Sequence, residues 1–343
     1  MNKKLRSVLS MVLCLLLVSA SLVACNNNTD DTSKPNPDVT PATYKQAEYN
    51  TTTATMPSNW NELTYADNND TQIMNYIGSS FFDYDYKFEN NKKYNDDGSI
   101  KEEFKVPSNL YCAVYQEELC GYMAGYAAVK LGYKQLGFLG GMAVPAVVRY
   151  GYGFVQGVNA AATELNIADQ VSVKYVYGNK FAPAPEITAV MDTWYKGGTE
   201  VVFACGGGIY ASAAEAAAKV EGAKVIGVDV DQAGIIDGAY GEGMTVTSAM
   251  KGLAPTVKTV LAAISADKWA DFGGKIETLG LVSENPDDNY VQLAGSTQFA
   301  DGFTQDDYKT LVASMFKGDI KVDNSTEKMP EVSVKVETFD NIL

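Results

Sequence analysis

Two carboxylates follow one predicted strand closely, and their spacing suggests chemistry. Asp229 ends the apolar stretch that begins at Lys224, and Asp231 comes two residues later. An Asp at the end of a strand often only caps the next helix, but one cap is sufficient. The second acid therefore suggests that one of the pair has another task. That task is either binding a small ligand or, if both acids act together, hydrolysis.

Three consecutive glycines follow another predicted strand. The segment Gly206-Gly207-Gly208-Ile-Tyr lacks the G-x-G-x-x-G spacing of a dinucleotide-binding loop, and the Ala-rich helix behind it lacks the usual acidic partner. Glycines in this place either let backbone N–H groups approach a small ligand or permit a tight strand-to-helix turn. Both roles can hold at once.

The composition excludes several other functions. The chain of 343 residues contains no His, which excludes Ser-His-Asp and Cys-His nucleophiles, a His general base and His metal sites. Its net charge of −15 argues against nucleic acid, because a phosphate-reading surface needs a basic face. Glu117 and Glu118 could form a catalytic pair, but acids are also favoured in the first turn of a helix, and we assign neither to the site. We expect no metal, no cofactor and no catalytic residue.

Apolar strands alternate with amphipathic helices from about residue 110 onward. The predicted strands are residues 110–115, 136–139, 171–177, 200–205 and 224–229, and residues 244–247 are strand-like. The predicted helices are residues 117–131, 146–165, 185–196 and 212–220. This alternation is typical of an α/β fold whose parallel sheet is covered on both faces. Ligands of such sheets bind at the carboxyl ends of the strands, where the glycines and acids above are placed.

The N-terminal segment is predicted to be a targeting signal. Three basic residues precede an apolar run from Val8 to Val23, which is a signal-peptide pattern over residues 1–24. The run ends in Leu-Val-Ala-Cys25, which resembles a bacterial lipobox and implies lipidation of Cys25. A plain secretory signal with an incidental Cys is the alternative. Residues 25–43, rich in Asn, Asp, Thr and Pro, are predicted to form a disordered tether.

The remaining cysteines do not form a disulfide framework. Cys112, Cys120 and Cys205 are too few for one in a body of this length. The sequence leaves open whether Cys112 and Cys120 are bridged. The simplest interpretation is three small buried hydrophobic residues.

Five stretches between about residues 106 and 323 carry a family resemblance. They are Glu117-Glu-Leu-Cys-Gly-Tyr-Met-Ala-Gly-Tyr126, Gly137-Phe-Leu-Gly-Gly141 with Pro145 and Gly153-Phe-Val-Gln-Gly157, Val201-Val-Phe-Ala-Cys-Gly-Gly207, Gly227-Val-Asp-Val-Asp-Gln232 and Thr247-Ser-Ala-Met-Lys251. Their order and spacing resemble the basic membrane protein (BMP) family, PnrA-like solute-binding lipoproteins of ABC transporters for purine nucleosides. The resemblance implies a type I periplasmic-binding-protein-like fold, in which two α/β lobes joined by three crossovers close on a ligand.

The resemblance also implies roles for individual residues. The first acid of the family motif, here Asp229, accepts hydrogen bonds from the ribose hydroxyls, which leaves Asp231 with a structural role. Lys251 matches a lysine that points into the cleft, although a surface Lys is the simpler interpretation. Phe181 matches an aromatic residue that stacks on the base, with Tyr177 as a competing candidate and a core Phe as the alternative. The full set of predicted ligand-binding residues is Phe181, Gly206, Gly207, Asp229 and Lys251.

The resemblance implies two discontinuous lobes, of which the first departs from the family. The first lobe would comprise residues 44–135 with about 245–272, and the second residues 136–244 with about 273–330. Residues 44–105 lack the Asp-x-Gly-x-x-Asn-Asp motif of the family and resemble, more weakly, the start of an oligopeptide-binding lipoprotein. We therefore expect an incomplete first lobe, as in a chimera or an internally deleted paralogue.

The sequence thus predicts a non-enzymatic solute receptor. Such a protein would be held at the outer face of the bacterial membrane by lipid on Cys25, bind a purine nucleoside between its lobes and pass it to an ABC permease. The alternatives are a degenerate paralogue with weak or no binding, a nucleoside hydrolase that uses the two acids, and a surface adhesion or sensor protein.

Overall fold

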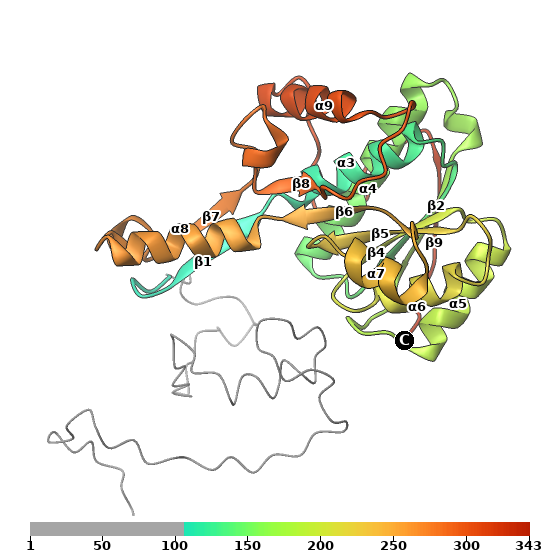
Figure 1. Cartoon of the computed structure of the whole chain (residues 1–343), viewed down its shortest axis with the longest axis horizontal. Helices are drawn as coiled ribbons and strands as arrows, with labels where there is room; N and C mark the ends of the chain where they lie inside the picture. Colours follow the sequence, from blue (N-terminus) through green and yellow to red (C-terminus); the bar gives the residue numbers. More distant parts are fainter. Residues whose placement is uncertain (1–105) are drawn as a thin grey trace, which may run out of the picture. The chain divides into compact units, whose positions relative to one another are not determined.

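The computed structural model describes residues 106–343 (Figure 1). The chain divides into two compact units, Met1–Tyr84 and Asp85–Leu343, and every described residue belongs to the second. The predicted signal peptide (1–24), the lipidation site Cys25, the tether (25–43) and the atypical segment 44–105 lie outside the described residues. No helix between residues 106 and 343 has the length and apolar character needed to span a bilayer.

The described residues alternate between strands and helices over most of their length. The strands are β1 (Tyr111–Tyr115), β2 (Gln135–Gly140), β3 (Ser172–Tyr177), β4 (Val201–Cys205), β5 (Lys224–Asp229), β6 (Thr245–Lys251), β7 (Lys275–Leu279), β8 (Val291–Leu293) and β9 (Lys335–Thr338). The α-helices are α3 (Glu117–Lys130), α4 (Pro145–Glu164), α5 (Pro185–Lys196), α6 (Tyr210–Ala217), α7 (Ala233–Tyr240), α8 (Leu253–Ser265) and α9 (Gln305–Lys317).

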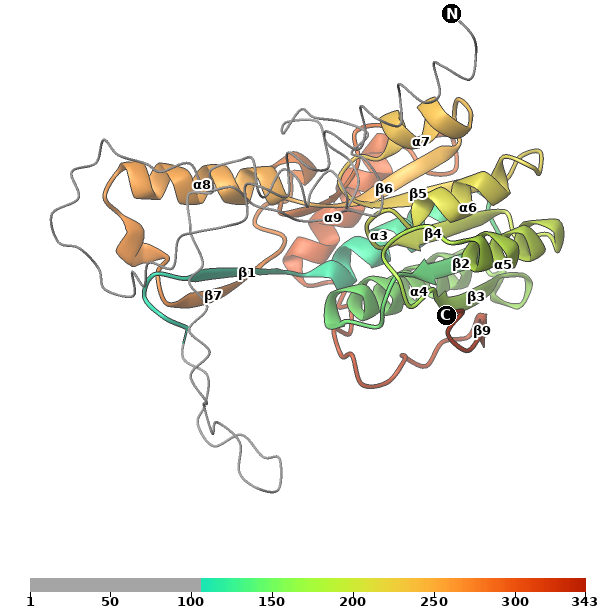
Figure 2. The same ribbon diagram turned by 90° about the horizontal axis from the view of Figure 1, so that it is seen from below.

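The larger sheet has seven strands in the order β8-β6-β5-β4-β2-β3-β9, and only β8 is antiparallel. Two buried clusters cover its faces. Residues of α3, α4 and α9 pack on one face, and residues of α5, α6 and α7 pack on the other (Figure 2). All five residues of β4 are buried, because successive side chains enter opposite clusters.

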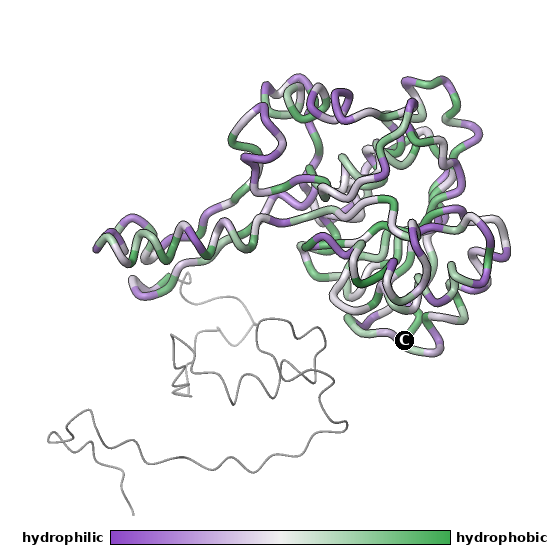
Figure 3. Tube along the Cα trace, viewed as in Figure 1, coloured by the Kyte–Doolittle hydropathy of each residue, from purple (hydrophilic) through white to green (hydrophobic). Residues whose placement is uncertain are grey.

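The smaller sheet consists, within the described residues, of two parallel strands, β1 and β7. Helix α8 lies beside it (Figure 2), where the Tyr115 and Thr256 hydroxyls form a hydrogen bond of 2.7 Å. Hydrophobic and hydrophilic residues alternate along α8 (Figure 3), and Leu253, Val257 and Leu261 are exposed. The predicted α/β class with mainly parallel sheets is confirmed. The expected incompleteness of the first lobe falls on residues 44–105, which lie outside the described residues.

Between residues 106 and 343 the chain passes between the two sheets at three points. They follow β1 at Gln116, β6 at Gly252 and β7 at Gly280. Backbone hydrogen bonds connect these crossovers: Gln116 donates to Leu279 O (2.9 Å), Gly252 donates to Tyr290 O (2.7 Å), and Tyr290 donates to Gly280 O (3.0 Å). The three segments therefore form one connected hinge region.

The crossovers differ from the lobe boundaries that the sequence predicts at residues 135, 245 and 272. Helix α3 was placed in the first lobe, but it packs against α4 and belongs to the core of the larger sheet. Strand β6 was placed there as well, yet it pairs with β5 along most of its length. Both elements bury apolar side chains in the core cluster of the larger sheet.

Helices α3 and α4 approach each other through four glycines. Gly121 and Gly125 on α3 face the α4 backbone, and Gly153 and Gly157 on α4 face the α3 backbone. A Cβ atom at any of these positions would overlap a carbonyl oxygen of the opposite helix. The close approach therefore requires glycine, and it sets where the N-terminal residues of α3 lie relative to α4.

Candidate functional site

The predicted binding residues gather at one edge of the larger sheet. Asp229 ends β5 and Lys251 ends β6, and these two strands are neighbours. Gly206 and Gly207 come directly after β4, and Phe181 lies in the loop after β3. Because parallel strands end on the same side, all five residues occupy the carboxyl edge, where α/β sheets bind ligands.

Asp229 and Lys251 form an ion pair, with 3.2 Å between Oδ1 and Nζ. The Asp229 side chain is 38% exposed and that of Lys251 is 16% exposed, so the carboxylate faces outward and the ammonium lies beneath it. The side-chain contacts that Asp229 makes within residues 106–343 all fall on Oδ1, which leaves Oδ2 without a partner among these residues. The backbone of Asp229 has a φ of 66°, a left-handed conformation that residues other than glycine adopt only rarely.

A second carboxylate holds Lys251 from the other side. Glu117 Oε1 lies 3.4 Å from Lys251 Nζ, and Glu117 Oε2 accepts a hydrogen bond of 2.7 Å from Arg149 Nε. The Glu117 side chain is only 3% exposed. Buried charges need opposite partners, and here they alternate in sign through Arg149, Glu117, Lys251 and Asp229.

Aromatic rings form the walls around Lys251. Its Nζ lies 5.3 Å from the centre of the Tyr150 ring and 5.9 Å from that of Tyr115. Burial alone would lower the pKa of Lys251, but the charges of Asp229 and Glu117 outweigh it and raise that pKa above its usual value. Burial raises the pKa of Tyr150 well above its usual value, so its hydroxyl stays neutral, 3.5 Å from Asp229 Oδ1. The ammonium is therefore permanently charged at the base of the site.

Phe181 lies against two of the glycine turns. A Cβ at Gly206 would come within 2.9 Å of Phe181 Cδ1, and one at Gly141 would overlap the same ring. The Phe181 carbonyl accepts a hydrogen bond of 2.8 Å from the Gly208 amide. Gly207 has a φ of 52°, so this turn needs glycine for its conformation as well as for space. The ring therefore rests, half-buried, on the strand ends.

Tyr177, the competing aromatic candidate, is half-buried against the same core cluster as Phe181. Its hydroxyl forms a hydrogen bond of 2.9 Å with Tyr175, and its ring packs edge-on against Phe138. Asp231 is exposed, and its Oδ1 accepts hydrogen bonds from the Ala233 amide (3.1 Å) and the Ser296 hydroxyl (2.7 Å). The structural role that the resemblance suggested for Asp231 stays a prediction.

Three residues of this network were missed or left without a role. Glu117 was left as an acid of the first helical turn, and Arg149 and Tyr150 were not singled out. One signal could have found them: Glu117 closely follows the end of β1, and Arg149 and Tyr150 lie in the first turns of the helix after β2. These are the same strand-end positions that pointed to Asp229.

Other chemistry receives no support from the described residues. No cluster of three or more His, Cys, Asp or Glu side chains between residues 106 and 343 could hold a metal ion. Cys112, Cys120 and Cys205 are free thiols, so the bridge that the sequence left open is absent. Cys120 is buried, and its thiol donates to the Met250 and Gln292 carbonyls.

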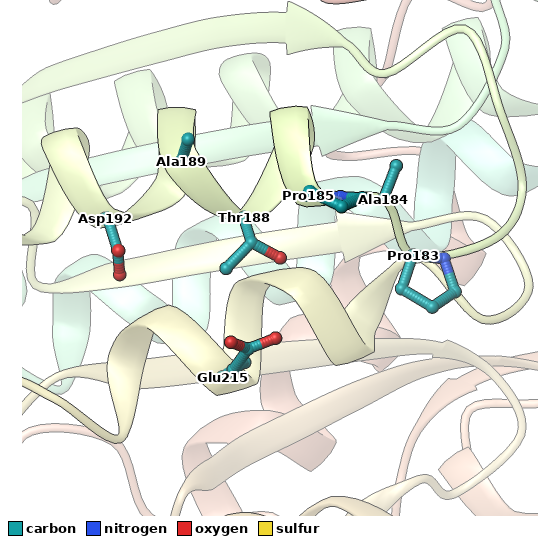
Figure 4. A pocket seen from close by; sticks show the side chains of 7 residues that line it. All are labelled: Pro183, Ala184, Pro185, Thr188, Ala189, Asp192 and Glu215. Atoms are coloured by element: carbon teal, nitrogen blue, oxygen red, sulfur yellow. The ribbon is translucent and has the colours of Figure 1, made fainter.

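Two hollows lie in this part of the chain, and the first begins at Pro183 and Ala184, in the loop after β3 that also carries Phe181. A shallow groove of about 500 Å³ runs between α5 and α6 (Figure 4). It is lined by Pro183, Ala184, Pro185, Thr188, Ala189, Asp192 and Glu215. A second, of about 70 Å³, lies between the segment Asn285–Gly295 and the start of α9. Neither hollow is lined by a predicted binding residue. We therefore place the candidate site by its chemistry, at the strand ends.

Glu118, next to Glu117, provides a test of the buried charges. Its side chain is 4% exposed, and its carboxylate lies 4.0 Å from Arg149 Nε. Burial raises the pKa of Glu118 from 4.5 to about 7. Because this pKa is higher in the folded than in the unfolded state, protonation of Glu118 stabilises the fold. This contribution is fully present below pH 4.5 and is lost as the pH rises through 7. We expect stability to fall by up to about 1.4 kcal/mol per pH unit across that window.

Urea unfolding of the unchanged chain and of Glu118→Gln at pH 5, 6, 7 and 8 measures this effect. In Glu118→Gln the free energy of unfolding should fall much less between pH 5 and 7 than in the unchanged chain. An equal decline in both proteins would contradict the assignment to Glu118.

Comparison with known proteins identifies the family of the chain. A family model described as ABC transporter substrate-binding protein PnrA-like (Bmp) matches residues 39–317. Basic membrane protein B of Borreliella burgdorferi is 25% identical over 182 residues, which cover 52% of this chain and 50% of the relative. The ABC transporter nucleoside-binding protein BmpA of Lactococcus lactis is 28% identical over 136 residues, 37% of either chain. The chain thus matches about half the length of these relatives or less.

A solved structure with a related arrangement is an ABC transporter solute-binding protein from Conexibacter woesei. It is 20% identical and covers 64% of this chain and 67% of its own, with a TM-score of 0.47.

The family match extends further toward the N-terminus than the motifs that we recognised. It begins at residue 39 and therefore includes residues 44–105, for which the sequence suggested another solute-binding family. A separate origin of that segment is not supported by this match. Since the family model covers most of the chain, the chain belongs to the Bmp family of PnrA-like ABC transporter substrate-binding proteins.

Proposed function

We propose that this chain is the extracytoplasmic receptor of an ABC importer and binds a purine nucleoside at the carboxyl edge of its larger sheet. In this proposal Asp229 accepts hydrogen bonds from the ribose hydroxyls, Phe181 stacks on the base, and Lys251 supports the carboxylate. Gly206 and Gly207 let the backbone approach the ligand. Lipid on Cys25 holds the body at the outer membrane face, where an ABC permease receives the nucleoside.

The observation that carries the proposal is the state of Asp229. Oδ1 is held by Lys251, whereas Oδ2 has no partner among residues 106–343 and the side chain is partly exposed. A fixed carboxylate with one free oxygen suits a neutral ligand that donates hydroxyl hydrogens. A relative named as a nucleoside-binding protein points to the same ligand class.

Hydrolysis is the less favoured alternative. A two-carboxylate mechanism needs both acids to face one substrate, but the Asp231 carboxylate already accepts bonds from Ser296 and Ala233. The proposed receptor leaves the nucleoside intact, so chromatography after incubation should show no free base.

Isothermal titration of the chain with guanosine, adenosine, inosine and uridine tests the proposal. We expect the purine nucleosides to bind with Kd near or below about 1 μM, and uridine more weakly. Phe181→Ala should weaken binding by about 1–3 kcal/mol, because the stacking surface is lost. Absence of binding at millimolar nucleoside would contradict the proposal and favour a degenerate paralogue.

A further inference from the structure

Lys251 belongs both to the candidate ligand site and to the hinge region. It is the last residue of β6, directly before the crossover at Gly252. Glu117 is the first residue of α3, directly after the crossover at Gln116. The Lys251–Glu117 ion pair of 3.4 Å therefore ties one crossover to another.

Glu117 is anchored more firmly than Lys251. Its buried carboxylate is held on the opposite side by Arg149 of α4, at 2.7 Å from Nε. Helix α4 is in turn fixed to α3 by the glycine contacts. Lys251 is instead shared between two carboxylates at similar distances, 3.2 Å to Asp229 and 3.4 Å to Glu117. The ammonium is thus the adjustable member and Glu117 the fixed one.

An ordinary helix-start role does not account for Glu117. The structure shows no side-chain cap at the start of α3, and an acid that only complements the helix dipole would remain in water. Glu117 is instead turned inward, with each oxygen facing a different cation. Removing its charge would leave Arg149 and Lys251 underneutralised in a buried place.

We propose that Glu117 is a positioning residue that couples the ligand site to the hinge through Lys251. This inference rests on the proposed function of Asp229. Glu117 draws the ammonium toward the crossovers and so keeps it from fully occupying the Asp229 carboxylate. When a ligand binds Asp229, the Lys251 ammonium moves closer to Glu117. The backbone around Gln116 and Gly252 then changes its hydrogen exchange.

The test compares Glu117→Gln, Glu117→Asp and the unchanged full chain, with guanosine as the probe. Glu215→Gln is the matched control, since it removes one carboxylate charge from an exposed ion pair with Lys219. Titration gives the affinity, and hydrogen exchange with mass spectrometry follows peptides spanning residues 114–118 and 250–254. Exchange in β4 reports global opening.

We expect Glu117→Gln to bind guanosine about tenfold more weakly or worse, and to lose the ligand-induced change in exchange at both crossovers. Glu117→Asp keeps the charge and should recover part of both. Glu215→Gln should behave as the unchanged chain. Unchanged affinity and crossover response in Glu117→Gln would overturn the proposal, and so would a loss accompanied by faster exchange in β4.

Exchange without nucleoside separates this inference from the proposed function. If the unchanged chain binds no nucleoside, the proposed function fails. Faster exchange at residues 250–254 in Glu117→Gln, relative to the unchanged chain, would still support the tie between the crossovers. Equal exchange in the two proteins would overturn it.

Discussion

Asp229→Asn is expected to abolish measurable nucleoside binding at micromolar concentrations. The amide places two N–H donors where one carboxylate oxygen accepted, so they would face the ribose hydroxyl hydrogens, and Lys251 loses a counter-charge. Hydrogen bonds to charged groups contribute about 1.5–3 kcal/mol, so losing them should weaken binding roughly 100-fold. Isothermal titration with guanosine measures the change.

Asp231→Asn is the matched control for this prediction. It makes the same chemical change two residues away, at a carboxylate already bonded to Ser296 and Ala233. We expect it to retain guanosine affinity within about threefold, since no ligand contact is removed. If Asp229→Asn also stayed within threefold, the site would have to be sought elsewhere in the chain.

Gly125→Ala is expected to destabilise the fold by about 2–3 kcal/mol. Alanine has the higher helix propensity, which alone would stabilise α3 by about 1 kcal/mol. The added Cβ, however, overlaps the Phe154 carbonyl of α4, and a backbone atom cannot turn away as a flexible side chain can. The helices must separate, which weakens the cluster between them. Urea unfolding measures the difference.

Gly238→Ala in α7 provides the control for crowding. A Cβ at that position meets nothing within 4 Å, so only helix propensity remains and the variant should be as stable as the unchanged chain or slightly more so. A Gly125→Ala protein as stable as Gly238→Ala would show that the close contact between α3 and α4 is not required.

Local periodicity predicted the central elements of the fold well. Strands β1 to β5 and helices α3 to α6 lie within a few residues of the predicted ranges, because each combines an apolar pattern with a clear stop such as glycine. Strand β6 was predicted only as far as Thr247 and continues to Lys251. Its final residues are supported by pairing with β5 and β8, which no local pattern reveals.

The residues of the candidate site likewise fall into those that the sequence predicted and those that it did not. The Asp229 and Lys251 positions followed from strand ends and family motifs. The Glu117–Arg149 contact did not, since it depends on helices that meet through glycines 32 residues apart in the chain. A first-turn acid and a buried ion-pair partner have the same sequence pattern. Only the packing of α3 on α4 distinguishes them.

The left-handed backbone at Asp229 costs folding free energy at a residue that the proposed ligand site needs. A non-glycine residue with positive φ raises the free energy of the native state by about 1 kcal/mol or more, and Asn tolerates that region well. Asn relieves part of this cost, and Glu117 still neutralises Lys251 when the Asp229 charge is lost, so Asp229→Asn should melt close to the unchanged chain while its affinity falls. A side chain whose removal costs affinity but little stability serves recognition rather than architecture, and variants selected only for thermal stability would tend to lose it.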